Sequence, residues 1–107
     1  MENNCVTVWT TIAASVNGLE LASILVTEKL AACVNVLPEM DSVYRWKGQV
    51  EVDRERQVIM KTTAHRVDTL KARLHELHEY EVPEFIVMPI VGGSNTYLQW
   101  IRESTGG

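Results

Sequence analysis

The order in which apolar patterns follow one another along the chain constrains its fold more than any other feature. Alternating or β-branched runs at residues 6–12, 33–46, 57–63 and 85–91 predict strands. Helical spacing of apolar residues at 15–31 and 64–78 predicts two helices, and residues 95–103 predict a short closing helix. The resulting βαββαβ order predicts an α+β, ferredoxin-like domain, in which an antiparallel sheet carries helices on one face.

Three segments carry more specific expectations. The strand at 33–46 is expected to be irregular at Pro38, which cannot donate to a ladder, and Lys47-Gly48 predicts the turn that follows. The mixed-charge residues 53–56 predict a solvated loop or a twisted section of strand. Residues 85–91 are apolar on both faces, which predicts a buried strand that ends near a sheet edge at Pro89. The expected buried stripes are Leu19, Ala22, Val26 and Leu30, with Leu21 and Leu25 beside them, and then Val67, Leu70, Leu74 and Leu77.

The central hairpin is too long for a domain of this size. The 14 residues from Cys33 to Trp46 would span roughly 48 Å as a strand at ~3.4 Å per residue. A globule of this length has a radius of gyration of ~13 Å, hence a width of roughly 35 Å. We therefore expect the hairpin to extend beyond its own helices, carrying Val43, Tyr44 and Trp46 at its tip. Exposed apolar side chains on a strand need cover, and a second copy in closed symmetry is the simplest cover.

Composition excludes several classes of protein. The 107 residues predict a single domain over 1–107, and the net charge of -4 argues against nucleic acid and anionic membrane surfaces as partners. No apolar run approaches the ~18 residues that cross a bilayer. Two cysteines, Cys5 and Cys33, do not make a disulfide framework. With no signal-peptide pattern at the start of the sequence, the expected location is the cytoplasm.

The segment 78–84 gathers the side chains best suited to chemistry. It holds His78 and three carboxylates, those of Glu79, Glu81 and Glu84, and His75 lies one helical turn earlier. Imidazole and carboxylate groups could form a cation site or an acid–base pair. The alternative is a solvated helix end, where a histidine is favourable in its own right.

Cys33 and Lys61 leave two interpretations each. Cys33 is either a nucleophile, which would need a nearby base, or a small buried residue. Lys61 interrupts an apolar strand, so it either pairs with a carboxylate such as that of Glu84 or faces solvent. No nucleophile–base–orienter spacing is present, so we expect that the protein is not an enzyme.

Five spaced motifs together resemble those of the CutA divalent-cation-tolerance family. They run in order along the chain: KLAACVN at 29–35, SVYRWKG at 42–48, KTT at 61–63, HEYEVPE at 78–84 and YLQWI at 97–101. The resemblance implies a ferredoxin-like fold, a homotrimer similar in architecture to the PII signalling proteins, and a role in tolerance to divalent metals, chiefly copper. It implies a trimer interface at Val43, Tyr44 and Trp46.

The resemblance also implies candidate sites. A metal such as Cu(II) would be held by His78, with Glu84 or Cys33 as partners. Copper-binding members place a Cys in the first strand and a His pair before the Pro, where this chain has Thr10, Leu77 and His78. Glu79 replaces the usual Pro, so the loop is less rigid and more acidic. Alternatively, the trimer signals by holding a small ligand or a partner in a cleft between subunits, lined by Lys61, Tyr80 and Glu84.

Overall fold

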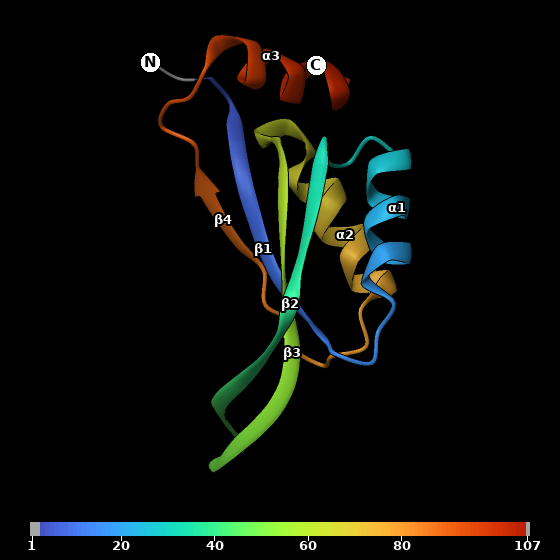
Figure 1. Cartoon of the computed structure of the whole chain (residues 1–107), viewed down its shortest axis with the longest axis vertical. Coiled ribbons are helices and arrows are strands. Elements are labelled where there is room, and N and C mark those ends of the chain that lie inside the picture. The colour runs from blue at the N-terminus through green and yellow to red at the C-terminus, as the bar shows by residue number, and fades with distance from the viewer. Residues whose placement is uncertain (1–2, 107) are drawn as a thin grey trace.

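Four strands form one antiparallel sheet in the computed structural model, which describes residues 3–106. The strand order is β2-β3-β1-β4, and helices α1 and α2 cover one face of the sheet (Figure 1). This is the α+β, ferredoxin-like fold that the sequence predicts. In chain order the elements are β1 (Cys5–Ala13), α1 (Gly18–Thr27), β2 (Cys33–Trp46), β3 (Gln49–Thr63), a 3-10 turn (Ala64–Arg66), α2 (Val67–Leu77), β4 (Ile86–Pro89) and α3 (Asn95–Ser104).

Helix α1 is shorter than predicted and turns a different face to the core. The Asn17 side chain caps it by accepting from the Glu20 backbone N–H at 3.0 Å, and the chain leaves the helix before Lys29, which has φ 61°. The predicted stripe is right only in part. Leu21, Leu25 and Leu30 are buried as predicted, whereas Leu19 is 76% exposed and Val26 is 42% exposed. Gly18 lies on the buried face as well.

A close approach between α1 and β2 explains this orientation. A Cβ atom at Gly18 would lie 2.8 Å from Val36 Cγ1 and 3.2 Å from Ile12 Cδ1. Only glycine allows the helix to start this near the sheet. The contact fixes the rotation of α1 about its own axis, and the difference from the predicted stripe follows from it.

The β2–β3 hairpin is continuous and extends beyond the rest of the molecule. Pairing between the two strands shifts between Val36 and Glu39, around Pro38, as predicted. Lys47 and Gly48 have φ of 49° and 80°, the pair of positive values that a two-residue type I′ turn requires. Residues 53–56 belong to β3, which resolves the choice between loop and strand.

The part of the hairpin that leaves the sheet, residues 41–54, is called the arm below. Pairing of β1 with β3 ends at Ala13 and Glu55, so β3 pairs only with β2 beyond that point. The arm projects past both helices in Figure 1, along the 44 Å long axis of the chain. The predicted overhang is therefore confirmed. Its apolar side chains are exposed in a single chain: Val43, Tyr44, Trp46, Val50 and Val52.

The main core lies between the sheet and the two covering helices. Leu70 and Leu74 of α2 are buried as predicted, with Val67 and Leu77 partly buried beside them. Helix α3, capped by Ser94, lies across one end of the sheet and closes a second small cluster (Figure 1). That cluster joins Cys5, Ala32, Leu98 and Ile101.

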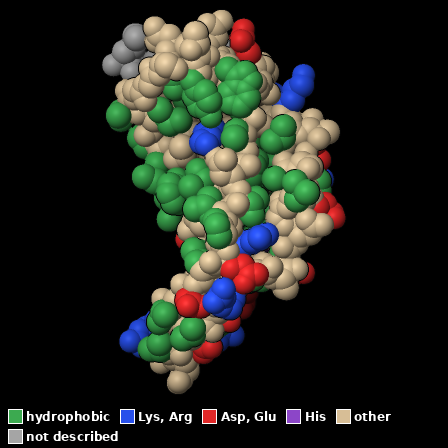
Figure 2. Space-filling model, in the orientation of Figure 1, with side chains coloured by type: hydrophobic (Ala, Val, Ile, Leu, Met, Phe, Trp, Pro, Cys, Tyr) green, Lys and Arg blue, Asp and Glu red, His purple; other side chains and the backbone are tan. Residues whose placement is uncertain are grey.

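Strand β4 is exposed, which contradicts the prediction of a buried strand at 85–91. It is an edge strand that pairs only with β1, and Ile86, Val87 and Met88 all face solvent to a large extent. Pro89 does end the strand at an edge, as predicted. Figure 2 shows hydrophobic side chains gathered over the body of the molecule, above an arm with mixed charge. Apolar composition predicts burial but does not say which chain supplies the cover.

Candidate functional site

The loop after α2 is fastened to the sheet by His78. Its Nε2 lies 2.6 Å from the Thr11 carbonyl oxygen, and its Nδ1 accepts from the Tyr80 backbone N–H at 3.1 Å. Because Nδ1 accepts, the proton is on Nε2, which donates to Thr11. Both ring nitrogens are therefore engaged in holding residues 78–80 against β1. A metal could bind His78 in this chain only if one of these two bonds opened.

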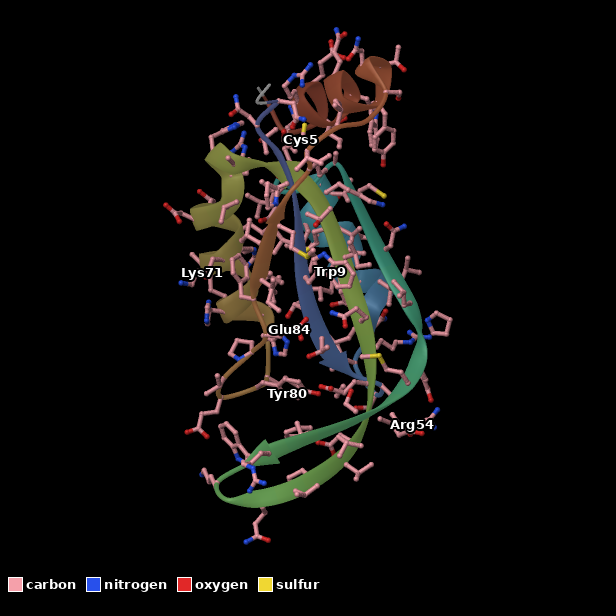
Figure 3. All side chains as sticks on the ribbon, turned by 90° about the vertical axis from the view of Figure 1, so that its left-hand side faces the viewer. Cys5, Trp9, Arg54, Lys71, Tyr80 and Glu84 are labelled. Carbon is pink, nitrogen blue, oxygen red and sulfur yellow. The ribbon has the colours of Figure 1, made fainter. Side chains whose placement is uncertain are left out.

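Two carboxylates are held on the sheet face opposite α1 and α2. The Tyr80 hydroxyl donates to Glu55 Oε2 at 2.7 Å, and Glu55 is only 7% exposed. The Gln57 side-chain amide donates to Glu84 Oε2 and to the Thr10 carbonyl oxygen, each at 2.8 Å. Glu55 and Gln57 are two residues apart on β3, so they point to the same face. In Figure 3, Tyr80 and Glu84 lie on the side of the sheet where the loop between α2 and β4 runs, and the arm bends toward the same side.

These residues line a cleft of about 640 Å³ between the arm and the 79–84 loop. Tyr44, Trp46 and Tyr80 contribute aromatic surface. The remaining lining residues are polar, acidic or aliphatic: Thr11, Met40, Ser42, Glu55, Gln57, Glu79, Glu81, Val82, Pro83 and Glu84. The cleft thus combines aromatic walls with four carboxylates.

The two tyrosines that face carboxylates remain protonated donors at neutral pH. The hydrogen bond from Tyr44 to Asp53 raises the pKa of Tyr44 to about 12, with desolvation adding to the effect. Burial raises the pKa of Tyr80 well above its ordinary range, and the hydrogen bond to Glu55 raises it further. Neither hydroxyl is suited to act as a general base. Their role in this geometry is to donate to anionic oxygens.

The structure does not bring the predicted site residues together in one chain. Cys33 pairs with Lys61 across β2 and β3, four residues along β3 from Gln57, which is about 13 Å of strand. The Lys61 ammonium donates to the Asn35 side chain, and the Cys33 thiol lies 3.8 Å from the same oxygen. Lys61 does not line the cleft of Tyr80 and Glu84.

The metal set of His78, Cys33 and Glu84 therefore stays a prediction. Within residues 3–106, no group of three or more His, Cys, Asp or Glu side chains is arranged to hold a metal ion. The resemblance to the family implied ligand positions at Thr10 and Leu77. In this chain Thr10 is buried and Leu77 packs against the main core.

Glu55 and Gln57 are the site residues that sequence reasoning missed. Glu55 lies in the mixed-charge stretch 53–56, whose composition suggested only solvation. Strand alternation would have placed Glu55 and Gln57 on one face, had the whole stretch been assigned to a strand. The pairing of Glu55 with Tyr80, 25 residues later, depends on how the loop folds back over the sheet.

Comparison with known families identifies the chain. Residues 6–104 match the model of the CutA1 divalent ion tolerance protein. The chain belongs to the CutA1 family. This confirms the resemblance carried by the five sequence motifs.

Relatives from a bacterium and a plant are similar to this chain in sequence. The divalent-cation tolerance protein CutA of Thermus thermophilus is 49% identical over 86 residues, covering 80% of this chain and 84% of that protein. The chloroplastic protein CutA of Arabidopsis thaliana is 44% identical over 100 residues, covering 94% of this chain and 55% of that protein. The chain thus spans about half the length of that plant relative.

Solved CutA1 structures share the whole fold. The structure of the Thermus thermophilus protein has a TM-score of 0.91 at 43% identity, covering 95% of this chain and 99% of that one. CutA1 from the psychrotrophic bacterium Shewanella has a TM-score of 0.92 at 31% identity, with both chains covered completely (100%). Within residues 3–106 of the present chain, every helix is too short or too polar to cross a bilayer.

Proposed function

We propose that this protein acts in the cytoplasm as a homotrimer that binds or responds to a divalent metal ion such as Cu(II), and that it catalyses no reaction. Membership of the CutA1 divalent ion tolerance family over residues 6–104 carries the proposal. The Thermus relative, named as a divalent-cation tolerance protein, supports the same role. In this proposal, the protein contributes to tolerance of divalent metal ions by binding the ion and by assembling into a trimer.

Two unlike apolar surfaces support the oligomer. One is the arm, with Val43, Tyr44 and Trp46, and the other is the edge strand β4 at the opposite side of the sheet. Exposed apolar strands are liabilities unless another chain covers them. Two different surfaces that fit each other make a head-to-tail contact, which closes into a ring when the rotation permits. A three-membered ring would cover every arm and every β4 edge.

The metal-binding part of the proposal requires a local rearrangement. To bind a metal ion, His78 would break one of its two hydrogen bonds and coordinate the ion together with Glu84. Cys33 would come from a second copy or remain outside the site. Copper and related ions favour imidazole and thiolate ligands, which gives this residue set its chemical basis.

Light scattering with and without Cu(II) tests assembly and metal together. At micromolar concentration we expect three times the chain mass of 12.1 kDa, and saturable binding of one Cu(II) per subunit. A monomer mass would contradict the trimer. Cu(II) that fails to bind at micromolar concentration would contradict the metal role.

A histidine variant tests the site assignment. His78→Ala should abolish the saturable Cu(II) binding, whereas His65→Ala, an exposed histidine in the 3-10 turn, should leave it unchanged. If both variants bind copper as the unmodified protein does, His78 is not a ligand. Circular dichroism of both variants shows whether the loop change affects the fold.

A further inference from the structure

The turn between β1 and α1 contains the one Asn-Gly pair of the chain, Asn17-Gly18. Asn17 is exposed and caps α1, since its side-chain oxygen accepts from the Glu20 backbone N–H at 3.0 Å. Figure 1 places the turn beneath α1, on the side of the molecule away from β4. The turn therefore belongs to neither of the two surfaces, the arm and β4, that are proposed to meet in the oligomer.

The backbone nitrogen of Gly18 is not engaged in a hydrogen bond. Gly18 is the first residue of α1, where backbone N–H groups have no partner within the helix. Among residues 3–106, its N–H also finds no acceptor outside the helix. Because glycine has no side chain, nothing on residue 18 obstructs the approach of this nitrogen to the neighbouring Asn17 amide. Gly18 therefore supplies a nucleophile beside that amide.

The capping hydrogen bond polarises the Asn17 amide. The Glu20 N–H donates to the amide oxygen, and a donor in this position stabilises the negative charge that develops there when a nucleophile adds to the carbonyl carbon. The amide, the attacking nitrogen and the donor to the developing oxyanion all lie within residues 17–20. The arrangement that caps the helix thus also favours a reaction of the chain with itself.

We infer that Asn17 is a site of spontaneous modification, at which the Gly18 nitrogen converts the side-chain amide into aspartate or isoaspartate. The nitrogen gives up its proton to water and bonds to Cγ of Asn17, and the amide nitrogen leaves as ammonia. Water then opens the cyclic succinimide. Breaking the bond from Gly18 N to Cγ gives aspartate, whereas breaking the bond from Gly18 N to the backbone carbonyl carbon gives isoaspartate. The net change is loss of ammonia and gain of water.

The two products differ in their effect on α1. Aspartate keeps an acceptor at the cap and adds negative charge at the helix N-terminus, where it is favourable. Isoaspartate carries the main chain through the former side chain, which removes the cap and lengthens the backbone just before Gly18. A Cβ atom at Gly18 would already lie 2.8 Å from Val36 Cγ1, so the start of the helix has no room to move toward the sheet. Isoaspartate should therefore destabilise the protein, and aspartate should not.

Peptide mapping of the unmodified protein tests the site. Samples are held folded at neutral pH, digested in acid, where the reaction is slow, and analysed by mass spectrometry. Asn95 is the internal control, because it is exposed at the start of α3 but is followed by the β-branched Thr96. We expect conversion of amide to acid to be about tenfold faster at Asn17 than at Asn95, because glycine leaves the attack unobstructed. Equal rates in the folded protein, even with Asn17 faster in urea, would overturn the inference.

Two variants and the separated products provide a second test. Asn17→Ser keeps a capping oxygen but has no amide, so it should abolish the isoaspartate that enzymatic methylation detects, whereas Asn95→Ser should leave the signal unchanged. The isoaspartate form, isolated by hydrophobic-interaction chromatography, should unfold at a lower temperature than Asn17→Asp. An undiminished signal in Asn17→Ser, or equal unfolding temperatures of those two forms, would contradict the inference. None of these measurements involves Cu(II), so the proposed function is tested separately.

Discussion

At the scale of single residues, the contact between Tyr80 and Glu55 joins the two sides of the candidate site. Tyr80 could be selected from the sequence because it lies in a motif dense in ionisable groups. Glu55 could not, because its neighbours Arg54 and Arg56 give it the composition of a solvated segment. Its burial results from a strand register and a returning loop, neither of which is encoded within the stretch itself. Tertiary pairing of polar residues is the part of a site that local sequence predicts least.

Tyr80→Phe should lower the free energy of unfolding by about 1 kcal/mol at pH 7, because Glu55 loses a hydrogen bond in a buried position. The pKa of Tyr80 is raised in the folded protein, so the folded state favours the protonated hydroxyl. Its contribution is therefore complete below about pH 10, the ordinary tyrosine value, and is lost as the pH rises further. Urea unfolding of both proteins at pH 7 and above pH 10 measures the change. A difference that grew with alkalinity would contradict this account.

At the scale of elements, the sequence predicted more about type and order than about orientation. All four strands and three helices lie where periodicity suggested, because long amphipathic patterns depend little on their surroundings. The rotation of α1 about its own axis could not be predicted from the sequence pattern, since both Leu19 and Leu21 fit a helical stripe. The choice between them is made by the packing of Gly18 against Val36. The prediction that β4 is buried was wrong for a related reason, because β4 is an exposed edge strand in a single chain.

Gly18→Ala should destabilise the protein by about 1–2 kcal/mol, because the added methyl group would overlap Val36, whose β-branched side chain has little freedom to move. Gly92→Ala is the matched control: an added Cβ there would meet no atom within 4 Å, and the expected change is within about 0.5 kcal/mol. Denaturant midpoints at one chain concentration compare the two. Equal midpoints would show that α1 shifts away from the sheet at no cost.

The arm supports a prediction about assembly. Val43→Glu places a charge on an exposed apolar position of the arm and should shift the light-scattering mass toward the monomer, with circular dichroism unchanged. Leu19→Glu makes a similar change at an equally exposed position on α1 and should leave the mass unaltered. The residue 43 variant tests whether the arm is the interface. If only the Leu19 variant dissociates, the subunits meet through the helices instead.

At the scale of the whole molecule, one chain contains two regions that differ in how much packing stabilises them. The body has a core between the sheet and two helices, whereas the arm has no second layer within residues 3–106 of a single chain. An isolated two-stranded hairpin is marginal in water. In the proposed trimer, the arm is therefore the region whose stability would depend most on neighbouring copies.

The midpoint of thermal unfolding should rise with protein concentration, because assembly stabilises the folded chain by mass action. Over a hundredfold range of concentration we expect a clear upward shift for the unmodified protein and a smaller one for Val43→Glu. Calorimetry at three concentrations measures both. A midpoint independent of concentration would indicate that the body carries the full stability alone.

If the proposed trimer forms, the arm also leaves each newly made chain vulnerable until it assembles. In the proposed trimer another copy covers the backbone between residues 41 and 54, so a chain that has not yet assembled would expose this segment to proteases, whereas its body is protected by its core. Cleavage near Lys47-Gly48 in a pulse-labelled sample therefore measures how long a chain waits for its partners. A cell that makes too little of this protein would lose it to degradation faster than one that makes it in excess, so its abundance would depend on its own rate of synthesis more steeply than in proportion.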